Sequence, residues 1–491
     1  MSTCPMTIEE PQESFHIVFF PMMGHGHMIP MLDIAKLFAT HQVKTTIITT
    51  PCNATTFTRP LGSYKNVGPP IDVEIIPFPS QEAGLPEGIE NFEDVTSPEM
   101  VGKLWKATQM LEEALEKVLE KLNPNGLIAD KLFPFSTRVA SKFGIPRLIF
   151  QGTGYFSLSI IEALKQYEPH KKVSSDDEEF VIPNLPNEIK MTRLKLPEHI
   201  RESDKTSNDH GEFLKLTIQA EVDSMGIICD TFYELEHDYA RHCRNVLGKK
   251  IFSFGPVSLC NRDKEAKFCR GKDSVIDEVE CLKWLDSKKE GSVVYVSFGT
   301  LTIFSTIQIC QIARALEASE QEFIWVVKKT KGEADEVDEQ DWLPEGFEDR
   351  VKDKGLIIKG WAPQMLILDH KSIGGFLTHC GWNSILEATS FGVPMVTWPV
   401  FADHFYNEIL VTEILKTGIS VGAKKWSRVV DDSVKEENVT EAIRRVMVGD
   451  EALDIRERAN KLKEMARNAV EGGSSYNELI NLIQLLRDYR P

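Results

Sequence analysis

The sequence WAPQMLILDHKSIGGFLTHCGWNSILEATSFGVPMVTWPVFADH, residues 361–404, carries the clearest structural pattern in the chain. An apolar run at 373–377 leads into a polar turn at 379–384, and a segment with helical spacing of apolar residues begins at Ile385. The order of strand, tight turn and helix is typical of a parallel α/β sheet, in which ligands bind at the carboxyl ends of the strands. We therefore predict an α/β fold.

The turn and the helix start form a candidate anion site. Free backbone N–H groups and the positive end of the helix dipole attract phosphate, and the side chains of Asn383 and Ser384 offer further donors. The alternative is that one of these two residues only caps the helix.

Residues around this turn suit the other parts of a sugar nucleotide. Trp361 has a flat face for a base, and Glu387 has two carboxylate oxygens for ribose hydroxyls. Asp403 and His404 could hydrogen-bond a further polyol.

The front of the chain reads as a βαβ unit. Residues 16–20 form a continuous apolar run, as in a buried parallel strand, and a helix and a second strand at 43–50 follow. Gly24 and Gly26 resemble part of a dinucleotide loop, but Ile29 stands where the third glycine is expected. We therefore do not expect a nicotinamide cofactor.

Two titratable residues follow strands of this unit. His27 lies at the carboxyl end of the first strand, and Asp130 ends a predicted strand at 126–130. Parallel-sheet topology can bring the two side chains together. From spacing alone, a satisfied structural histidine is the better interpretation of His27, and Asp130 could equally be a cap for the helix predicted at 135–143.

Composition excludes several classes of partner. The chain has 491 residues, 42% of them hydrophobic, which is enough for two to three domains of the usual ~150 residues. A formal charge of -18 argues against nucleic acid or an anionic membrane as a partner. An anionic ligand must then be held by local dipoles and hydrogen bonds.

The cysteines and the apolar runs indicate a reduced, aqueous compartment. Nine scattered cysteines, an odd number without a CxxC pair, favour free thiols over disulfides or zinc. We see no signal peptide in the first fifteen residues and no apolar run near the ~20 residues of a membrane span. We expect a cytoplasmic monomer without membrane insertion.

The rest of the chain suggests two similar halves. A long amphipathic helix is predicted at 104–122 and an irregular loop region at 168–209. The βα pattern restarts at 292–298, followed by a turn at Gly299 and Thr300, and an acidic loop spans 332–341. The predicted domain boundaries are 1–255, a linker at 256–284, 285–470, and a C-terminal helix at 471–491.

Three segments carry a resemblance to a known family. The stretch 361–404, together with FPMMGHGHMIPMLDIAKLFA at 20–39 and GGSSYNELINLI at 472–483, resembles plant family 1 UDP-glycosyltransferases. The likeness is to the subgroup that acts on triterpenoids, steroids and flavonoids. It implies the GT-B architecture, two Rossmann-like domains facing across a cleft, with the last helix crossing back to the first domain.

The resemblance also implies roles for single residues. His27 is expected to be the general base and Asp130 to orient it, while His25, Gln151 and Gly152 are expected near the acceptor and the sugar. The residues expected to bind the UDP-sugar are Thr300, Trp361, Ala362, Gln364, His379, Gly381, Trp382, Asn383, Ser384, Glu387, Asp403 and His404. From its residue type alone, Trp382 could instead be a core tryptophan, and Thr300 an ordinary turn threonine.

Three residues depart from the pattern of glucosyl-transferring relatives. Gln151 and Gly152 stand where relatives often have tryptophan and threonine, and His404 stands where they usually have glutamine. Histidine at the last position resembles members that use galactose or a pentose. We therefore expect galactose slightly ahead of glucose as the donor sugar.

The expected activity is inverting transfer of a hexose from a UDP-sugar to a hydroxyl of a small hydrophobic acceptor. A triterpenoid or steroid, or its glycoside, is the first choice of acceptor, and flavonoid or phenolic O-glucosylation is the alternative.

No Asp-x-Asp tripeptide occurs at a strand end, so we expect no cofactor and no metal, the UDP-sugar being a co-substrate. A hydrolase is not expected because no G-x-S-x-G motif occurs. A non-catalytic sugar-nucleotide-binding protein is the alternative of another class.

Overall fold

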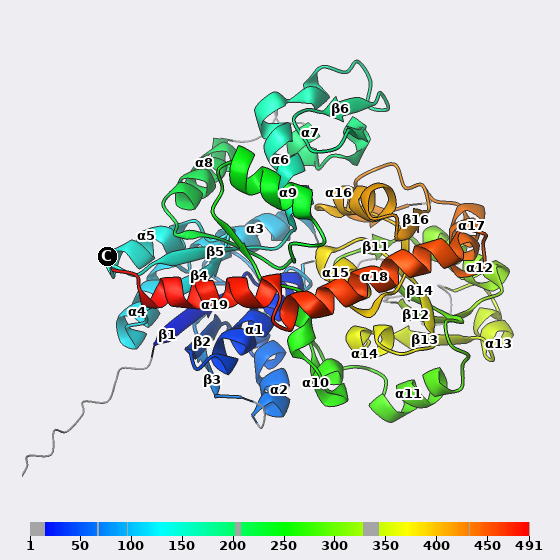
Figure 1. Cartoon of the computed structure of the whole chain (residues 1–491), viewed down its shortest axis with the longest axis horizontal. Helices are drawn as coiled ribbons and strands as arrows, with labels where there is room; N and C mark the ends of the chain where they lie inside the picture. The colour runs from blue at the N-terminus through cyan, green and yellow to red at the C-terminus, as the bar shows by residue number, and fades with distance from the viewer. Residues whose placement is uncertain are drawn as a thin grey trace, which may run out of the picture.

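The computed structural model describes residues 15–65, 68–95, 97–201, 208–327, 343–431 and 433–490. Two parallel sheets lie side by side, and two long helices near the C-terminus run along both (Figure 1). We call residues 15–253 the front lobe and residues 293–470 the rear lobe. The predicted acidic loop at 332–341 lies outside the described residues.

The front lobe is built on a seven-stranded sheet in the order β3-β2-β1-β4-β5-β8-β9. Its neighbouring strands all pair in parallel. The strands are β1 (His16–Phe20), β2 (Lys44–Thr49), β3 (Ile71–Ile75), β4 (Gly126–Asp130), β5 (Arg147–Gln151), β8 (Gly226–Cys229) and β9 (Ile251–Ser253). Because β1 and β4 are neighbours, the segments that follow them emerge at the same edge of the sheet.

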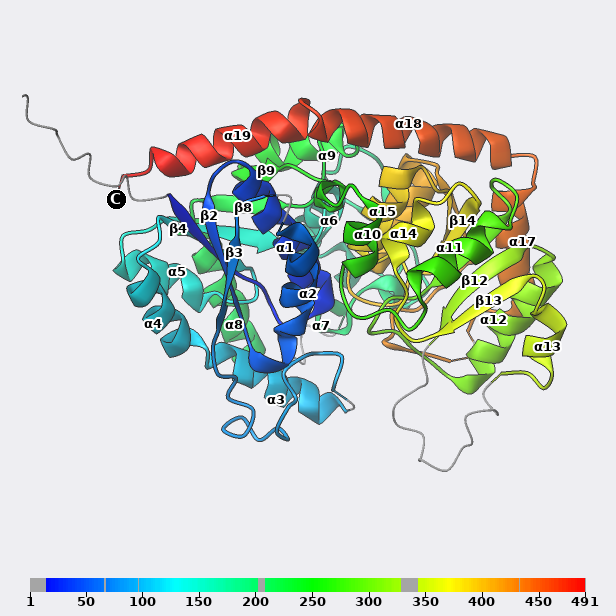
Figure 2. The same ribbon diagram turned by 90° about the horizontal axis from the view of Figure 1, so that it is seen from below.

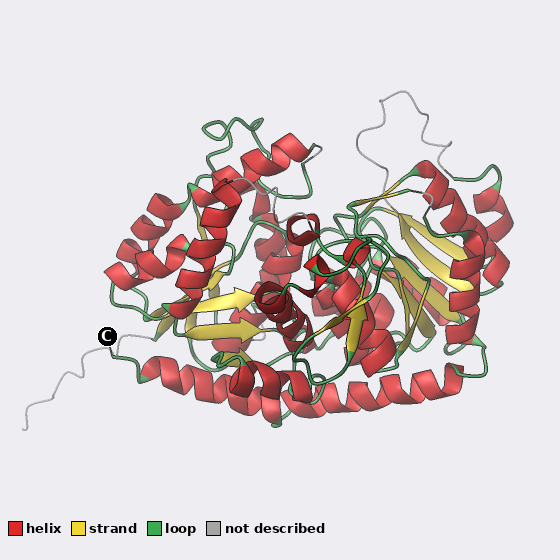
Figure 3. Cartoon of the chain, turned by 90° about the horizontal axis from the view of Figure 1, so that it is seen from above, coloured by secondary structure: helices red, strands yellow, loops and turns green. Residues whose placement is uncertain are grey.

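Helices pack around this sheet (Figure 3). They are α1 (His25–Thr40), η1 (Pro51–Asn53), α2 (Thr55–Tyr64), α3 (Pro98–Gln109), α4 (Glu112–Leu122), α5 (Phe135–Lys142), α6 (Tyr155–Tyr167), α8 (Asn208–Val222), α9 (His237–Arg241) and η5 (His242–Val246). The continuous apolar runs of the central strands are buried on both faces because helices cover both sides.

The single helix predicted at 104–122 is two helices. Helix α3 ends at Gln109 and α4 begins at Glu112. At the junction the N–H of Leu111 bonds the carbonyl of Thr108, three residues back rather than four. This tighter turn interrupts the α-helical hydrogen-bond pattern, although the apolar stripe is buried on both sides of the break.

The region predicted as an irregular loop, 168–209, contains regular structure. Strands β6 (Phe180–Ile182) and β7 (Ile189–Met191) form an antiparallel hairpin. Short helical turns flank it, namely η2 (Pro169–Lys171), η3 (Arg193–Lys195) and α7 (Glu198–Arg201). The outer two residues of each strand are buried against the core, whereas the middle residues, Val181 and Lys190, are exposed.

The segment between the lobes also contains helices. These are η6 (Val257–Cys260), α10 (Lys264–Cys269) and α11 (Glu278–Asp286). Asp263 caps α10 and Asp277 caps α11, each through a carboxylate that accepts a backbone N–H. The polar composition of this segment therefore does not prevent local helical structure.

The rear lobe has a six-stranded parallel sheet in the order β13-β12-β10-β14-β15-β16. The strands are β10 (Val293–Ser297), β12 (Glu322–Val327), β13 (Gly355–Lys359), β14 (Ile373–Thr378), β15 (Met395–Thr397) and β16 (Gly418–Ser420), and a small separate pair is β11 (Ile303–Phe304) with β17 (Val429–Val430). The helices are α12 (Thr306–Ser319), α13 (Phe347–Val351), α14 (Gln364–Leu368), α15 (Trp382–Phe391), α16 (His404–Ile409), η7 (Leu410–Ile414), α17 (Glu436–Met447) and α18 (Ala452–Val470).

The last helix joins the two lobes. Helix α18 packs on the rear lobe, and α19 (Ser474–Arg487) continues across the molecule onto the front lobe (Figure 2). The stripe of Leu479, Leu482, Ile483 and Leu486 is buried in one core cluster with residues of β1 and α1. None of the helices in the described residues is both long and apolar enough to span a membrane.

Candidate active site

His27 and Asp130 form a hydrogen-bonded pair at the edge of the front sheet. His27 lies in the first turn of α1, and Asp130 is the last residue of β4, which neighbours β1. His27 Nδ1 is 2.7 Å from Asp130 Oδ2, and Asp130 Oδ1 accepts the backbone N–H of Leu132 at 3.0 Å. A carboxylate accepts, so Nδ1 carries the proton and the neutral ring keeps an unprotonated Nε2.

The surroundings of the pair determine the basicity of the histidine. Asp130 is 1% exposed, whereas the His27 side chain is 34% exposed. Burial lowers the pKa of His27, but the charge and hydrogen bond of Asp130, helped by the charge of Asp403, outweigh it and hold the pKa above its usual range. An imidazole with a raised pKa and an open Nε2 can act as a general base.

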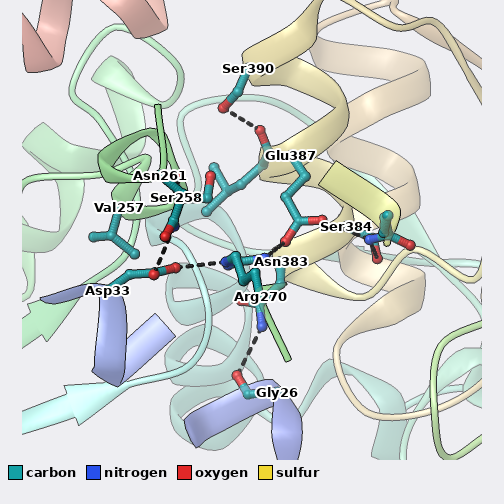
Figure 4. A network of polar contacts seen from close by, with 12 residues as sticks. Gly26, Asp33, Val257, Ser258, Asn261, Arg270, Asn383, Ser384, Glu387 and Ser390 are labelled. Atoms are coloured by element: carbon teal, nitrogen blue, oxygen red, sulfur yellow. Dashed lines mark hydrogen bonds and ion pairs between the residues drawn. The ribbon is translucent and has the colours of Figure 1, made fainter. Parts of the chain in front are cut away.

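The turn after β14 places the start of α15 against this pair. Gly381 is the residue before the helix, and no side chain caps it, so the alternative that Asn383 or Ser384 only caps the helix is wrong. Asn383 Nδ2 instead donates to the carbonyl of Gly26 at 2.9 Å, immediately before His27 (Figure 4). The predicted phosphate site thus lies beside the candidate base.

His379 is enclosed between two glycines of this turn region. A Cβ atom on Gly299 or on Gly381 would lie 2.5 Å from His379 Nε2. Gly299 also has a φ of +70°, which favours glycine. Thr300 follows in the same turn, so the carboxyl end of β10 reaches the same place as the start of α15.

The residues predicted to bind the base and ribose form a connected group. Gln364 Nε2 donates to Glu387 Oε2 at 2.7 Å and lies 3.1 Å from Ser384 Oγ. Trp361 and the buried Ala362 precede Gln364 on the segment after β13. The linker packs against Trp361: a Cβ atom on Gly271 would lie 2.5 Å from Trp361 Cζ2, and the N–H of Val275 donates to the carbonyl of Trp361 at 3.0 Å.

Asp403 and His404 face the front lobe and His379. Thr153 Oγ1 donates to Asp403 Oδ2 at 2.5 Å. His404 Nδ1 accepts the backbone N–H of Phe401 at 3.3 Å, and its ring is perpendicular to that of His379, with centroids 4.8 Å apart. Burial and the nearby His379 hold the pKa of His404 well below its usual range. The ring is therefore neutral, with its proton on Nε2.

Trp382 spans the two lobes. It is 4% exposed, and its indole N–H donates to the carbonyl of Asp230 at 2.7 Å. A Cβ atom on Gly154 would lie 2.6 Å from Trp382 Cζ2, so the ring packs closely on the front lobe. The prediction that Trp382 flanks the sugar stays a prediction beside this structural contact.

The remaining predicted residues lie on two sides of His27. A Cβ atom on Gly152 would lie 3.4 Å from His27 Cε1, and Gln151 is buried at the end of β5. His25 is also buried, pairs through Nδ1 with Glu93 and lines a cavity of about 710 Å³ together with residues of α2 and the linker.

Sequence reasoning missed Thr153, Glu93 and Arg270. Thr153 directly follows Gln151 and Gly152 at the carboxyl end of a predicted strand, and this position in the sequence could have indicated it. Arg270 pairs with Glu387, 117 positions away, and Glu93 pairs with His25, 68 positions away. The pattern of residues along the sequence does not predict contacts between positions so far apart.

Comparison with known proteins decides the family. The family model described as UDP-glucoronosyl and UDP-glucosyl transferase matches residues 234–447. The chain is 50% identical to scopoletin glucosyltransferase of Nicotiana tabacum over 475 residues, which covers 96% of this chain and 98% of the relative. The chain belongs to the plant UDP-glycosyltransferase family. This UDP-glycosyltransferase is also 51% identical over 486 residues to UDP-glucose flavonoid 3-O-glucosyltransferase 7 of Fragaria ananassa, with 97% of each chain covered.

A relative named for a glucuronide and a structure solved with one are similar too. The UDP-glycosyltransferase is 40% identical over 492 residues to soyasapogenol B glucuronide galactosyltransferase of Glycine max, with 98% of each chain covered. The crystal structure of Glycyrrhiza uralensis UGT73P12 with glycyrrhetinic acid 3-O-monoglucuronide superposes with a TM-score of 0.88 at 38% identity, covering 96% of both chains.

These findings confirm the family, the enzyme class and the GT-B architecture. The alternative of a non-catalytic sugar-nucleotide-binding protein is set aside. Within the described ranges of this UDP-glycosyltransferase, no group of three or more His, Cys, Asp or Glu side chains is arranged to hold a metal ion.

Proposed function

We propose that this UDP-glycosyltransferase transfers a hexose, with inversion, from a UDP-sugar to a hydroxyl group of a small hydrophobic acceptor. The observation that carries the proposal is the His27–Asp130 pair, 2.7 Å apart, beside the start of α15. These contacts support a candidate base and a candidate anion site at the junction of the two lobes. A UDP-sugar bound across this junction would present its anomeric carbon to His27.

The proposed reaction is a single displacement at the anomeric carbon. Nε2 of His27 takes the proton of the acceptor hydroxyl as its oxygen attacks, and UDP leaves from the opposite face. Asp130 stabilises the imidazolium that forms and does not itself take the proton. The raised pKa of His27 supports this role, because a more basic imidazole accepts a proton more readily.

The leaving diphosphate carries negative charge that must be stabilised. We assign this task to His379, Thr300 and the backbone N–H groups from Gly381 to Ser384, without a metal ion. Helix α15 has ten residues and no capping side chain, so N–H groups of its first turn remain for phosphate oxygens. Preorganised donors of this kind stabilise developing charge in the transition state.

His404 is the residue on which we base the choice of donor sugar. Its Nδ1 accepts a backbone N–H, so the neutral ring can only donate, through Nε2. A glutamine amide at this position would both donate and accept. Because galactose and glucose differ in the direction of one hydroxyl, a donor-only side chain can discriminate between them, and we propose galactose slightly ahead of glucose.

Two acceptor classes have support. The Glycyrrhiza uralensis structure and the Glycine max relative both concern triterpenoid glucuronides, which supports a triterpenoid or steroid, or its glycoside, as the first choice. Relatives near 50% identity are named for scopoletin and flavonoids, which supports O-glucosylation of a phenol as the second candidate. Both classes are hydrophobic and carry the hydroxyl that the reaction needs.

The remaining expectations are also proposals. We propose the domain boundaries 1–255, 256–284, 285–470 and 471–491, and a monomer. A cytoplasmic location is supported by the cysteines in the described part of the chain, all of which are free thiols.

One matrix of assays tests the proposal. UDP-galactose, UDP-glucose, UDP-xylose and UDP-glucuronic acid are each supplied with a triterpenoid, a triterpenoid glucuronide, a flavonol and a coumarin, and products are detected by mass spectrometry. We expect a β-linked hexoside on a hydroxyl of at least one acceptor. UDP binding without transfer to any acceptor would contradict the proposal, and retention of the anomeric configuration would contradict its mechanism.

A further inference from the structure

Arg270, on the segment between the lobes, bridges one carboxylate from each lobe. Its Nε lies 2.8 Å from Asp33 Oδ2, and its Nη1 pairs with Glu387 Oε1 (Figure 4). Asp33 is on α1, the helix that also carries His27, and Glu387 is on α15, the helix of the predicted phosphate site. The arginine therefore connects the helix of the candidate base to the helix of the donor site.

All three side chains of this bridge are removed from water. The Arg270 side chain is 8% exposed, Glu387 is 3% exposed and Asp33 is fully buried. Burial lowers the pKa of Arg270, but the two carboxylates outweigh it and raise the pKa above its usual value. A buried carboxylate needs such a partner, because an unpaired charge in this environment is strongly unfavourable.

The front-lobe end of the bridge is held by further polar contacts. Asp33 Oδ1 accepts a hydrogen bond from Asn261 Nδ2 at 2.8 Å and lies 3.6 Å from Lys36 Nζ. Two cations, Arg270 and Lys36, thus balance two anions, Asp33 and Glu387. Arg270 is fixed from the front lobe, and its guanidinium is rigid and planar, so the position of its second N–H group is defined.

At the rear-lobe end, both oxygens of Glu387 have a donor from the protein. Arg270 occupies Oε1, and Gln364 Nε2 donates to Oε2 at 2.7 Å. Each carboxylate oxygen can accept two hydrogen bonds, so one site on each oxygen remains for a hydroxyl donor. Two flanking donors therefore define the plane and rotation of the carboxylate, and each of its oxygens keeps one lone pair for a ribose hydroxyl.

We propose that Arg270 is a positioning residue for the donor: it orients the Glu387 carboxylate toward the nucleotide ribose and ties that orientation to α1. The inference rests on the proposed function, because it takes Glu387 as the ribose contact. It goes beyond it by assigning a role in donor binding to a residue of the linker. A purely structural ion pair would stabilise the fold without any preference for a ribose hydroxyl.

The chain offers a matched control on α10, the linker helix that ends immediately before Arg270. Lys267 Nζ pairs with Asp369 Oδ2 at 2.7 Å, so it also joins α10 to the rear lobe, but it contacts neither Glu387 nor Asp33 among the pairs in the described residues. Lys267→Met removes a linker ion pair without touching the ribose carboxylate. Arg270→Met removes the bridge, and Arg270→Lys keeps one charge without the fork that reaches both carboxylates.

The experiment compares binding of UDP and 2′-deoxy-UDP by isothermal titration calorimetry in the wild type and the three variants, with circular dichroism to verify folding. A hydrogen bond to a charged group corresponds to about ten- to a hundredfold in affinity. For Arg270→Met we expect UDP to bind at least about tenfold more weakly, while 2′-deoxy-UDP loses about threefold or less. Arg270→Lys should fall between, and Lys267→Met should match the wild type with both nucleotides.

Kinetics give a second readout. In Arg270→Met the KM for the UDP-sugar should rise by about the same factor as the UDP dissociation constant, with a much smaller change in kcat. Equal weakening of both nucleotides would overturn the inference in favour of a structural ion pair, and tighter UDP binding would overturn it in favour of an arginine that competes with ribose. If Arg270→Met does not fold, Arg270→Lys decides: loss of the preference for UDP supports the inference, and a wild-type preference overturns it.

The same data separate this inference from the proposed function. Wild-type protein that does not bind UDP at all would overturn both. UDP binding and sugar transfer by the wild type, with unchanged preference for UDP over 2′-deoxy-UDP in the Arg270 variants, would overturn the inference alone.

Discussion

At the residue scale, the chemistry depends on which nitrogen of each histidine carries the proton. His27 donates from Nδ1 to Asp130 and keeps a lone pair on Nε2, whereas His404 accepts at Nδ1 and keeps its proton on Nε2. Opposite hydrogen-bond partners thus suit His27 to act as a base and His404 to act as a hydrogen-bond donor. The two side chains can then serve the acceptor and the donor sugar, respectively.

The pH dependence of transfer tests the His27–Asp130 pair. The base must be neutral to accept a proton, so kcat/KM falls as pH drops through the pKa of His27. Because Asp130 holds this pKa above the usual 6.5, the acid limb of the wild-type profile should lie above pH 6.5. In Asp130→Asn the carboxylate that raises the pKa of His27 is lost, and burial then lowers this pKa. The acid limb should therefore move to lower pH, while the rate at pH 8 falls by about tenfold or more.

A pH series of kcat/KM from 5 to 9 measures both effects. The matched control is Asp72→Asn, a carboxylate on β3, which should leave the limb in place. An Asp130→Asn profile with an unmoved acid limb would show that Asp130 does not set the basicity of the catalytic group.

The donor preference tests His404. In His404→Gln the side chain gains an acceptor, so the ratio of kcat/KM for UDP-glucose over UDP-galactose should rise by about three- to tenfold, the size of one hydrogen bond. Donor competition with both sugars in one reaction gives this ratio directly. A ratio that stays constant would remove His404 from donor selection.

Residue roles were predictable only where the resemblance named them or where chemistry follows a strand end. His27 and Asp130 follow neighbouring strands, so sheet topology can bring them together. Arg270 could not be found in this way, because its two partners lie on other elements at 117 and 237 positions' distance. Such contacts depend on how the lobes pack, which periodicity does not encode.

At the element scale, the start of α15 is the feature on which the proposed mode of donor binding depends. Gly381 has an ordinary φ of -62°, so an alanine there would cause no backbone strain and would only crowd His379.

The apolar runs of the central strands made both sheets predictable, because buried parallel strands are apolar throughout. The break between helices α3 and α4 was not predictable, because the apolar stripe continues across it.

Gly381→Ala tests the packing of this helix start. The added Cβ would lie 2.5 Å from His379 Nε2, so the ring or the helix must move. Overpacking of this kind costs about 1–3 kcal/mol, and we expect UDP to bind about tenfold more weakly or worse. Gly102→Ala is the control, because nothing lies within 4 Å of the added atom, and α3 should tolerate it. Unchanged UDP affinity in Gly381→Ala would argue against phosphate binding at this turn.

Chelation of metal ions tests whether the start of α15 stabilises the charge of the diphosphate without a metal. After dialysis against EDTA, we expect kcat/KM to stay within about twofold of the value for the untreated enzyme, because fixed N–H donors stabilise the charge of the diphosphate. A control with added magnesium should give the same rate. Loss of transfer on chelation, restored by magnesium or manganese, would contradict this assignment.

At the scale of the whole molecule, the candidate site combines residues from both lobes. Asn383 reaches Gly26, Thr153 reaches Asp403, and Trp382 reaches Asp230, each across the junction of the lobes. Helix α19 adds a further tie between the lobes by burying its apolar stripe in the front-lobe core. The site is therefore a property of how the lobes meet, and neither sheet alone holds a base and an anion site.

The most direct measurement is made on His27→Ala, with UDP binding and sugar transfer determined on the same preparation. The side chain projects from the front lobe, whereas the assigned nucleotide contacts lie in the rear lobe, so UDP should bind with an affinity within about threefold of the wild type. Transfer should fall by about 10²–10⁴-fold, the usual contribution of a general base. Transfer near the wild-type rate in a variant that still binds UDP would contradict the account.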